Sequence, residues 1–387
     1  MGGKIEYSRH EAEFMKCAAS FPIVWKKAVD YYIWDENNKK YLDFTSGIFA
    51  INIGHSNPEV IDAIKKQLDK KLLFTFSYPT EIRKKFVDKL MSMVQPHLDK
   101  VALYCTGSET TDRAIQIARK HTGKKEVMTI EKCFHGNTCL WEDIYKSSKN
   151  KIDFPLTNDR DFDKDISYFE PESICAFILE GYQGWSAYVY PKEYVLKIEE
   201  WCRKNNILLI FDEVQSGMKR TGPLFCYENY GVKPDLVIFG KGAAGGLPLS
   251  GILGREKIMD CMNEEKFAST HSGNTLVMAT ALANLNEIEK IDSEEIKDKG
   301  EYFFKLLKNM KHKIIKSIVG KGLIAAVHFE NKEISERVAL KCLDNGLMVV
   351  NTGLTTLKIG PPLTIDKKSI KKGVDIIDKA IGEVEND

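Results

Sequence analysis

Residues 234–242 read Pro-Asp-Leu-Val-Ile-Phe-Gly-Lys-Gly, an apolar run that ends in a lysine between two glycines. Leu236–Gly240 is short and apolar throughout, which is typical of a strand buried on both faces of a parallel sheet. Such a strand would carry Lys241 to the sheet edge where α/β proteins bind ligands. The flanking glycines would let a bulky partner approach the backbone. A single lysine at a strand end is usually a surface group, so its meaning depends on the rest of the chain.

Similar apolar runs recur before and after this stretch, and amphipathic helices are expected between them at Glu109–Lys120 and Pro191–Lys204. The alternation predicts an α/β domain with a mostly parallel central sheet. The other strands are expected at Val101–Cys105, Glu126–Ile130, Ile174–Glu180, Ile207–Asp212 and Leu249–Leu253.

The two ends of the chain have a different pattern from the middle. Neither end has enough apolar residues for a core of its own, so we expect both to form one small α+β domain. The predicted division is an N-terminal segment at 1–50, a large domain at 51–284 and a C-terminal segment at 285–387. Helical periodicity covers Leu285–Met310 and Lys332–Asn345, with a short strand unit at Gly322–Phe329.

The overall composition is typical of a globular protein, and we expect the chain to be soluble and cytoplasmic. Lys+Arg of 56 against Asp+Glu of 55 gives a net charge of +1, which indicates neither a nucleic-acid nor a membrane partner. The nine cysteines are scattered without a CxxC pair, so we expect reduced thiols. No His or Cys cluster has the spacing of metal ligands, so no metal is expected.

Asp212 ends the predicted strand Ile207–Asp212, at the same sheet edge as Lys241. A buried carboxylate needs a cationic partner, and a protonated pyridine nitrogen would serve. A metal-binding or purely structural aspartate is the alternative.

Thr106-Gly107-Ser108-Glu109 lies between a predicted strand and a predicted helix. Free N–H groups at a helix start bind anions such as phosphate. A simple strand-to-helix turn is the alternative. Neither GxGxxG nor GxxxxGK[ST] occurs at this turn, so a nucleotide-binding fold is not supported.

Taken in order, these segments resemble the class III aminotransferases, which have the fold-type-I architecture and depend on pyridoxal 5′-phosphate (PLP). The resemblance covers nearly the whole chain, and no single block would suffice. The matching blocks are 41–44, 54–58, 106–109, Phe134-His135-Gly136, Glu180 with Gln183-Gly184, 212–217, Arg220-Thr221-Gly222, Lys241-Gly242, 270–274 and Pro361-Pro362-Leu363.

The resemblance implies a role for each matching residue. Lys241 would form the Schiff base with PLP and then act as the acid and base of the 1,3-proton shift. Thr270 would reach the phosphate of the neighbouring subunit, which implies a homodimer with shared active sites. The other cofactor contacts would be Asp212 at the pyridine nitrogen, Phe134 and Val214 on the two ring faces, Gln215 at the ring hydroxyl, Gly107 and Ser108 at the phosphate, and His135 and Glu180 nearby.

Four positions depart from the family pattern. Asn137 and Lys358 stand where arginines commonly grip substrate carboxylates, Trp185 replaces a glutamate, and Ile48 replaces a tyrosine of ornithine-type members. The resemblance therefore implies a less cationic, more aromatic substrate site. We expect transfer from an amine, amino sugar or ω/β-amino acid to a 2-oxo acid, with Lys358 either holding a carboxylate or lying on the surface.

Other functions stay open at this stage. The block Thr-His-Ser-Gly-Asn at 270–274 is similar to that of glutamate-1-semialdehyde aminomutases, which need no external acceptor. A PLP-dependent lyase is a further alternative. Outside PLP chemistry, the rival is a non-catalytic α/β binding protein, which would have no chemical need for Lys241 and Asp212 together.

Overall fold

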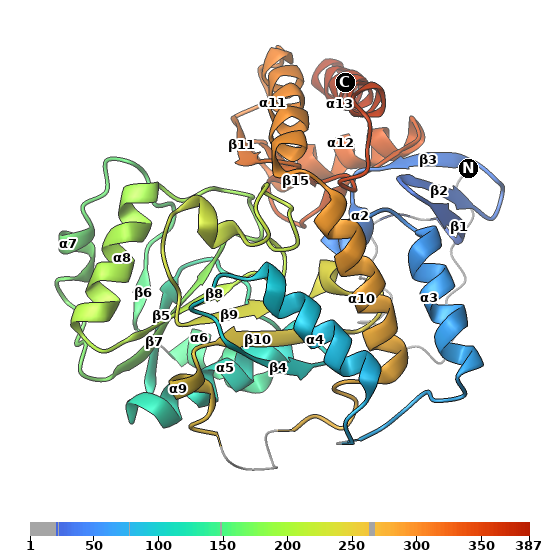
Figure 1. Ribbon diagram of the computed structural model, residues 1–387. Coiled ribbons are helices and arrows are strands. Elements are labelled where there is room, and N and C mark those ends of the chain that lie inside the picture. The colour runs from blue at the N-terminus through green and yellow to red at the C-terminus, as the bar shows by residue number, and fades with distance from the viewer. Residues whose placement is uncertain (1–20, 22, 77, 148, 263–267) are drawn as a thin grey trace.

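The computed structural model describes residues 21, 23–76, 78–147, 149–262 and 268–387 (Figure 1). Its largest sheet is parallel except for β10, which runs antiparallel to both of its neighbours. The strands lie in the order β4 (Lys100–Tyr104), β10 (Ser250–Gly254), β9 (Leu236–Phe239), β8 (Leu208–Asp212), β7 (Ile174–Glu180), β5 (Glu126–Ile130) and β6 (Lys151–Ile152).

The predicted fold class is confirmed, because each of the six predicted strands is present and none is displaced by more than one residue at either end. The two-residue strand β6 was not predicted, since so short a segment has no periodicity. In β7 and β8 every residue is buried, and their last residues, Glu180 and Asp212, pair with each other. The carboxyl ends of the parallel strands therefore meet at one edge.

Helices cover both faces of this sheet. On one face α5 (Gly107–Thr122) packs Ile115 and Ala118 against strand residues such as Ile210. On the other, α8 (Lys192–Lys204) packs Ile198 against Phe211 and its neighbours. Alternate strand residues serve opposite faces, which explains the continuous apolar runs.

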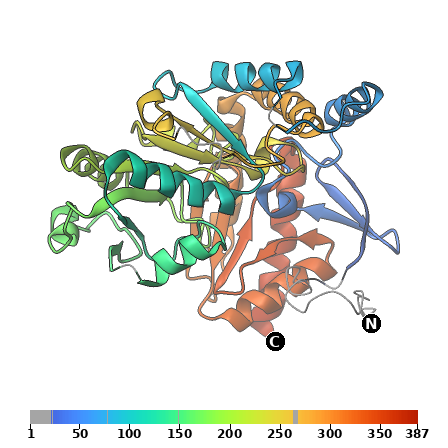
Figure 2. The ribbon, with the colours of Figure 1, turned by 90° about the horizontal axis from the view of Figure 1, so that it is seen from below.

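The two ends of the chain share a second core, as predicted (Figure 2). Strands β1 (Trp25–Val29), β2 (Tyr32–Asp35) and β3 (Lys40–Asp43) form a sheet with β13 (Leu347–Met348), which pairs parallel to β3. Phe44 packs edge-on to Phe303 of the C-terminal segment, with ring centroids 6.0 Å apart. The other C-terminal elements are β11 (Ser317–Lys321), β12 (Ile324–His328), β14 (Val350–Asn351), β15 (Thr356–Ile359), α11 (Ser293–Asn309), α12 (Lys332–Asp344) and α13 (Lys367–Asn386).

The predicted helical stretch Leu285–Met310 is two helices, α10 (Thr275–Lys290) and α11. The break occurs because Asp292 caps α11, its carboxylate accepting from the Glu294 N–H at 3.0 Å. The boundary proposed after residue 284 falls inside α10, which packs on α3 (Pro58–Asp69) and α4 (Glu81–Met93). The remaining helices are α6 (Cys139–Ser147), α7 (Phe162–Ile166) and α9 (Glu256–Met259).

An unusual turn, α2 (Ser46–Phe49), leads from the N-terminal strands to the large sheet. Its four residues have φ between 46° and 62°, so the turn is left-handed. Such backbone costs about 1–2 kcal/mol for each residue with a side chain. Tertiary contacts hold it: the Ser46 hydroxyl donates to the Gly360 carbonyl at 2.6 Å, and Phe49 is buried.

None of the described helices has both the length and the apolar character needed to span a bilayer.

Candidate active site

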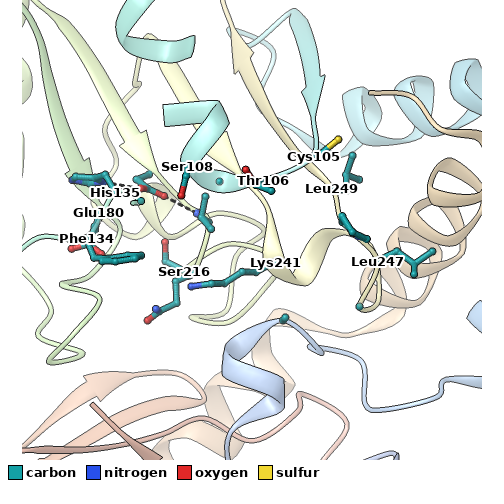
Figure 3. Close-up of a pocket in the computed structure, with 18 of the residues that line it drawn as sticks. Cys105, Thr106, Ser108, Phe134, His135, Glu180, Ser216, Lys241, Leu247 and Leu249 are labelled. Atoms are coloured by element: carbon teal, nitrogen blue, oxygen red, sulfur yellow. Dashed lines mark hydrogen bonds and ion pairs between the residues drawn. The ribbon is translucent and has the colours of Figure 1, made fainter. Parts of the chain in front are cut away.

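A cavity of about 360 Å³ opens at the edge where the parallel strands end (Figure 3). This volume is within the range of small-molecule sites. The lining comes from segments far apart in the sequence: Ala50, Cys105–Ser108, Phe134–Gly136, Glu180, Tyr182, Asp212, Val214–Ser216, Lys241 and Gly246–Leu249.

Lys241 begins the short 3₁₀ turn Lys241–Ala243 directly after β9, and its side chain points into the cavity (Figure 3). Burial lowers the pKa of its amine, although the Asp212 and Glu180 carboxylates partly oppose this shift. Lys241 also has a φ of 42°, an uncommon conformation for a residue with a side chain.

The glycines beside Lys241 are explained by the protein's own packing. A Cβ at Gly242 would lie 2.8 Å from the Asn52 amide, and one at Gly240 would lie 3.2 Å from the Ser250 hydroxyl. The expectation that both glycines make room for a ligand is therefore wrong for Gly242, whose space is taken by Asn52.

Asp212 and His135 form a buried pair, with Oδ2 and Nδ1 2.7 Å apart. The second Asp212 oxygen accepts from the Val214 N–H at 3.0 Å. Burial alone would lower the pKa of His135, but Cys133 and the Asp212 carboxylate raise it well above its usual value. The imidazole therefore holds the Asp212 carboxylate in a fixed orientation, where it can pair with a cation in the cavity.

Glu180 is a second buried carboxylate in the lining. Burial raises its pKa to about 7. Its Oε2 atom and the His135 Nε2 atom are both buried and have no hydrogen-bond partner within the described part of the chain. Buried polar atoms of this kind are rare in finished structures, so they indicate that a polar ligand completes the site.

The turn before α5 forms the other end of the cavity. The Thr106 hydroxyl caps the helix by accepting from the Glu109 N–H at 3.3 Å, which leaves the Gly107 and Ser108 N–H groups without intrahelical acceptors. Gly107 is required because a Cβ there would lie 3.1 Å from Val214. The Ser108 hydroxyl accepts from the Asn137 N–H at 3.1 Å, so the two loops support each other. This arrangement suits an anion such as phosphate.

The structure thus brings nine of the predicted cofactor-binding residues to one cavity. Thr270 is not among the lining residues and is exposed. The four predicted substrate residues do not line the cavity either. Ile48 and Asn137 are exposed, Trp185 packs edge-on to Phe134 with centroids 5.4 Å apart, and Lys358 is buried behind the lining.

Several lining residues were not predicted. Tyr182 lies shortly after β7, and Ser216 lies shortly after β8. The segment Gly246–Leu249 precedes β10. Because β10 is antiparallel, its beginning lies at the edge where the parallel strands end. Apolar runs do not reveal the direction of a strand, so the sequence carries no signal for this last group.

Comparisons with known proteins agree with this geometry. A family model described as aminotransferase class-III matches residues 15–381. An acetylornithine aminotransferase of Methanocaldococcus jannaschii is 31% identical, with 94% of each chain covered. A leucine/methionine racemase of Thermococcus litoralis is 32% identical over 94% of this chain and 91% of the racemase. The structure of a taurine:2-oxoglutarate aminotransferase from Bifidobacterium kashiwanohense, in complex with PLP and glutamate, aligns with a TM-score of 0.86 at 25% identity, covering 94% of this chain and 93% of that one.

The chain belongs to the class III aminotransferase family, and it is a transaminase that depends on PLP. Its cavity fits that cofactor: a buried aspartate bonded to a histidine, a helix start for phosphate and a buried lysine line one space. When bound, PLP supplies an aldehyde that captures amines and a ring that accepts the electron pair released beside the nitrogen.

Proposed function

We propose that this transaminase moves an amino group from an amine, amino sugar or ω/β-amino acid to a 2-oxo acid, or in reverse. Lys241 would hold the cofactor and, once released, take a proton from the donor carbon and return it at the neighbouring position. The observation that carries the proposal is the burial of the Lys241 amine, because a lowered pKa keeps part of it neutral and able to accept a proton.

The remaining residues of the cavity would bind and orient. Asp212, held by His135, would keep the pyridine nitrogen protonated, and the Gly107 and Ser108 N–H groups would hold the phosphate. Phe134 and Val214 would enclose the ring between them. Glu180 would lie near the cofactor, where its raised pKa lets it exchange a proton near neutral pH.

The substrate class is proposed from the composition of the lining. No arginine lines the cavity in the ranges that the structure describes, so a tight bidentate grip on a second carboxylate is not supported. Ile48, Asn137 and Trp185 would contact the donor from the rim. An amine or a neutral amino acid matches this rim better than a dicarboxylic donor.

We propose a homodimer in which Thr270 completes the partner's site. A run of exposed apolar side chains supports this: Leu72, Leu73, Phe74, Phe76 and Tyr78. The run is joined to the Thr270 segment, because Phe74 stacks near His271 and the Thr275 hydroxyl donates to the Leu72 carbonyl at 2.6 Å. Exposed apolar surface of this extent marks an interface. A cytoplasmic location is proposed from buried free thiols such as Cys175 and Cys202.

A half-reaction screen tests the proposed chemistry. PLP-loaded protein is mixed with candidate donors, and loss of the visible absorbance of the Lys241 Schiff base is followed. Lys241→Ala should abolish this band and reduce turnover at least about 10³-fold. The surface variant Lys368→Ala should behave as the unmodified protein. A band that persists in Lys241→Ala would contradict the lysine assignment. Turnover of dicarboxylic donors alone would contradict the substrate class.

Racemisation of a neutral amino acid is the second candidate function. The 32% identity to a leucine/methionine racemase favours it, as does the arginine-free lining within the described residues. A racemase would exchange the α-proton of leucine with deuterated solvent. The optical rotation of the leucine solution would then fall without any added 2-oxo acid. If no reaction of leucine occurs unless a 2-oxo acid is added, racemisation is excluded and only transamination remains.

A further inference from the structure

We infer that Lys358 is a positioning residue: it orients the Gln215 amide toward the cofactor and does not clamp a substrate carboxylate. The inference rests on the proposed function, because it gives Gln215 a ring oxygen to bind. At position 358 the family commonly carries an arginine, whereas this chain carries a lysine.

Lys358 lies on β15, and only 3% of the residue is exposed. Its ammonium donates to the Gly184 carbonyl and, at 2.9 Å, to the Gln215 Oε1 atom. It also lies 4.5 Å from the centre of the buried Phe49 ring. Gly184 lies in the loop after β7 and Phe49 in the strained turn α2, so the lysine is fixed between two segments that are far apart in the sequence.

The chemistry of the two side chains makes the contact directional. An ammonium has only donors, whereas a glutamine amide has one acceptor oxygen and one donor nitrogen. The Lys358 contact therefore holds Oε1 on the lysine side. Gln215 lines the cavity, so its Nε2 hydrogens remain to be donated to a ligand oxygen. Without the lysine the amide could rotate and present an oxygen, which a ring oxygen would repel.

The contacts of Lys358 do not suit a residue that clamps a substrate carboxylate. Lys358 does not line the cavity, and its described hydrogen-bond partners are both uncharged oxygens of the protein. To reach a substrate it would have to leave at least one of them buried and unpaired. Burial and the neighbouring Lys241 lower its pKa to about 7, so near neutral pH part of it is a neutral amine. A neutral amine binds an anion weakly but still has N–H groups to donate to Gln215 Oε1.

The experiment uses PLP-loaded protein without substrate and titrates the visible absorbance of the Lys241 Schiff base with pH. A hydrogen bond donated to the ring oxygen withdraws electron density from the neighbouring imine, so losing the bond should raise the imine pKa. Lys358→Met should raise it by about 0.5–1 unit. Gln215→Ala should give the same shift, and the double variant should add nothing further, because both changes remove one interaction.

Glutarate serves as the carboxylate probe, with its apparent Kd read from the same absorbance. In Lys358→Met that Kd should change less than threefold. An unchanged imine pKa, or a Kd that rises at least tenfold while the imine pKa stays constant, would overturn the inference in favour of a clamp. Lys358→Arg keeps the donors and should titrate like the unmodified protein. If Lys358→Met does not fold, a shifted imine pKa in Lys358→Arg becomes the contrary result. Absence of any Schiff-base band in the unmodified protein would instead refute the proposed function.

Discussion

The cofactor end of the cavity and the rim that we propose for the substrate are built from different kinds of structure. At the cofactor end, Asp212 and His135 are buried and bonded to each other. Asp212 ends a strand whose every residue is in the core, and His135 lies in the loop after β5. At the rim, 51% of Ile48 is exposed on a strained turn, and Asn137 is exposed on a loop. The first end has its geometry set before any ligand arrives, whereas the second has side chains that few neighbours constrain.

This difference separates chemistry from specificity. Changes at the cofactor end alter buried charges, whose removal is expensive. Changes at the rim alter solvent-facing groups, which proteins tolerate at little cost in stability. A family can therefore keep one reaction and vary its donors by substitution at the rim alone.

The largest effect is expected for Asp212→Asn, which removes the charge but keeps the shape. The pyridine nitrogen would lose its anionic partner, so the half-reaction rate should fall at least about 100-fold. Stopped-flow absorbance measures that rate. Asp260→Asn, at an exposed position, is the matched control. A rate within threefold of the unmodified protein would show that the Asp212 charge is not needed at the cofactor end.

An intermediate effect is expected for Glu180→Gln in the cofactor-free protein. Burial raises the Glu180 pKa to about 7, so between its ordinary value of 4.5 and 7 the folded chain binds more protons than the unfolded chain. Stability from this group is present below pH 4.5 and lost as the pH rises to 7. Glu180→Gln should therefore raise the Tm more at pH 8 than at pH 5, by roughly 2–6 °C. Thermal melts with the exposed control Glu256→Gln check this, and an equal change at both pH values would count against it.

The smallest effect is expected at the rim, for Ile48→Gly. Its φ of 60° disfavours a β-branched residue, and half of its side chain is exposed, so glycine should stabilise the fold by about 1 kcal/mol. Ile61 is the matched control: it is 39% exposed on the right-handed helix α3, where glycine should cost about 1 kcal/mol. Chemical denaturation compares the two variants. Loss of stability in both would mean that Ile48 makes contacts worth more than its strain.

The sequence was most informative where position along a strand determines position in space. Glu180, Asp212 and Lys241 each end an apolar run, and parallel strands necessarily bring such ends to one edge. Gly107 could be placed for a similar reason, since a helix start after a strand lies at that same edge.

What could not be predicted depends on partners far away in the chain. Nothing in Ser46–Phe49 except Gly47 indicates a left-handed turn, which contacts near Gly360 hold in place. Lys358 could be assigned to the surface or to a carboxylate, because its burial follows from the register of β15 against β12. The break between α10 and α11 was missed because a capping aspartate within an amphipathic stretch does not interrupt its periodicity.

The pairing of the two chain ends has a consequence for synthesis on the ribosome. The Ser46 hydroxyl and the Gly360 carbonyl that fix the strained turn are 314 positions apart. At about 5–20 residues per second, the N-terminal strands would wait roughly 15–60 s for β13 and β15 to emerge. During that time the large sheet can form while Phe44 and its neighbours stay unpaired. The nascent chain would therefore be a substrate for chaperones at its beginning, although every residue that lines the lysine pocket has by then been synthesised.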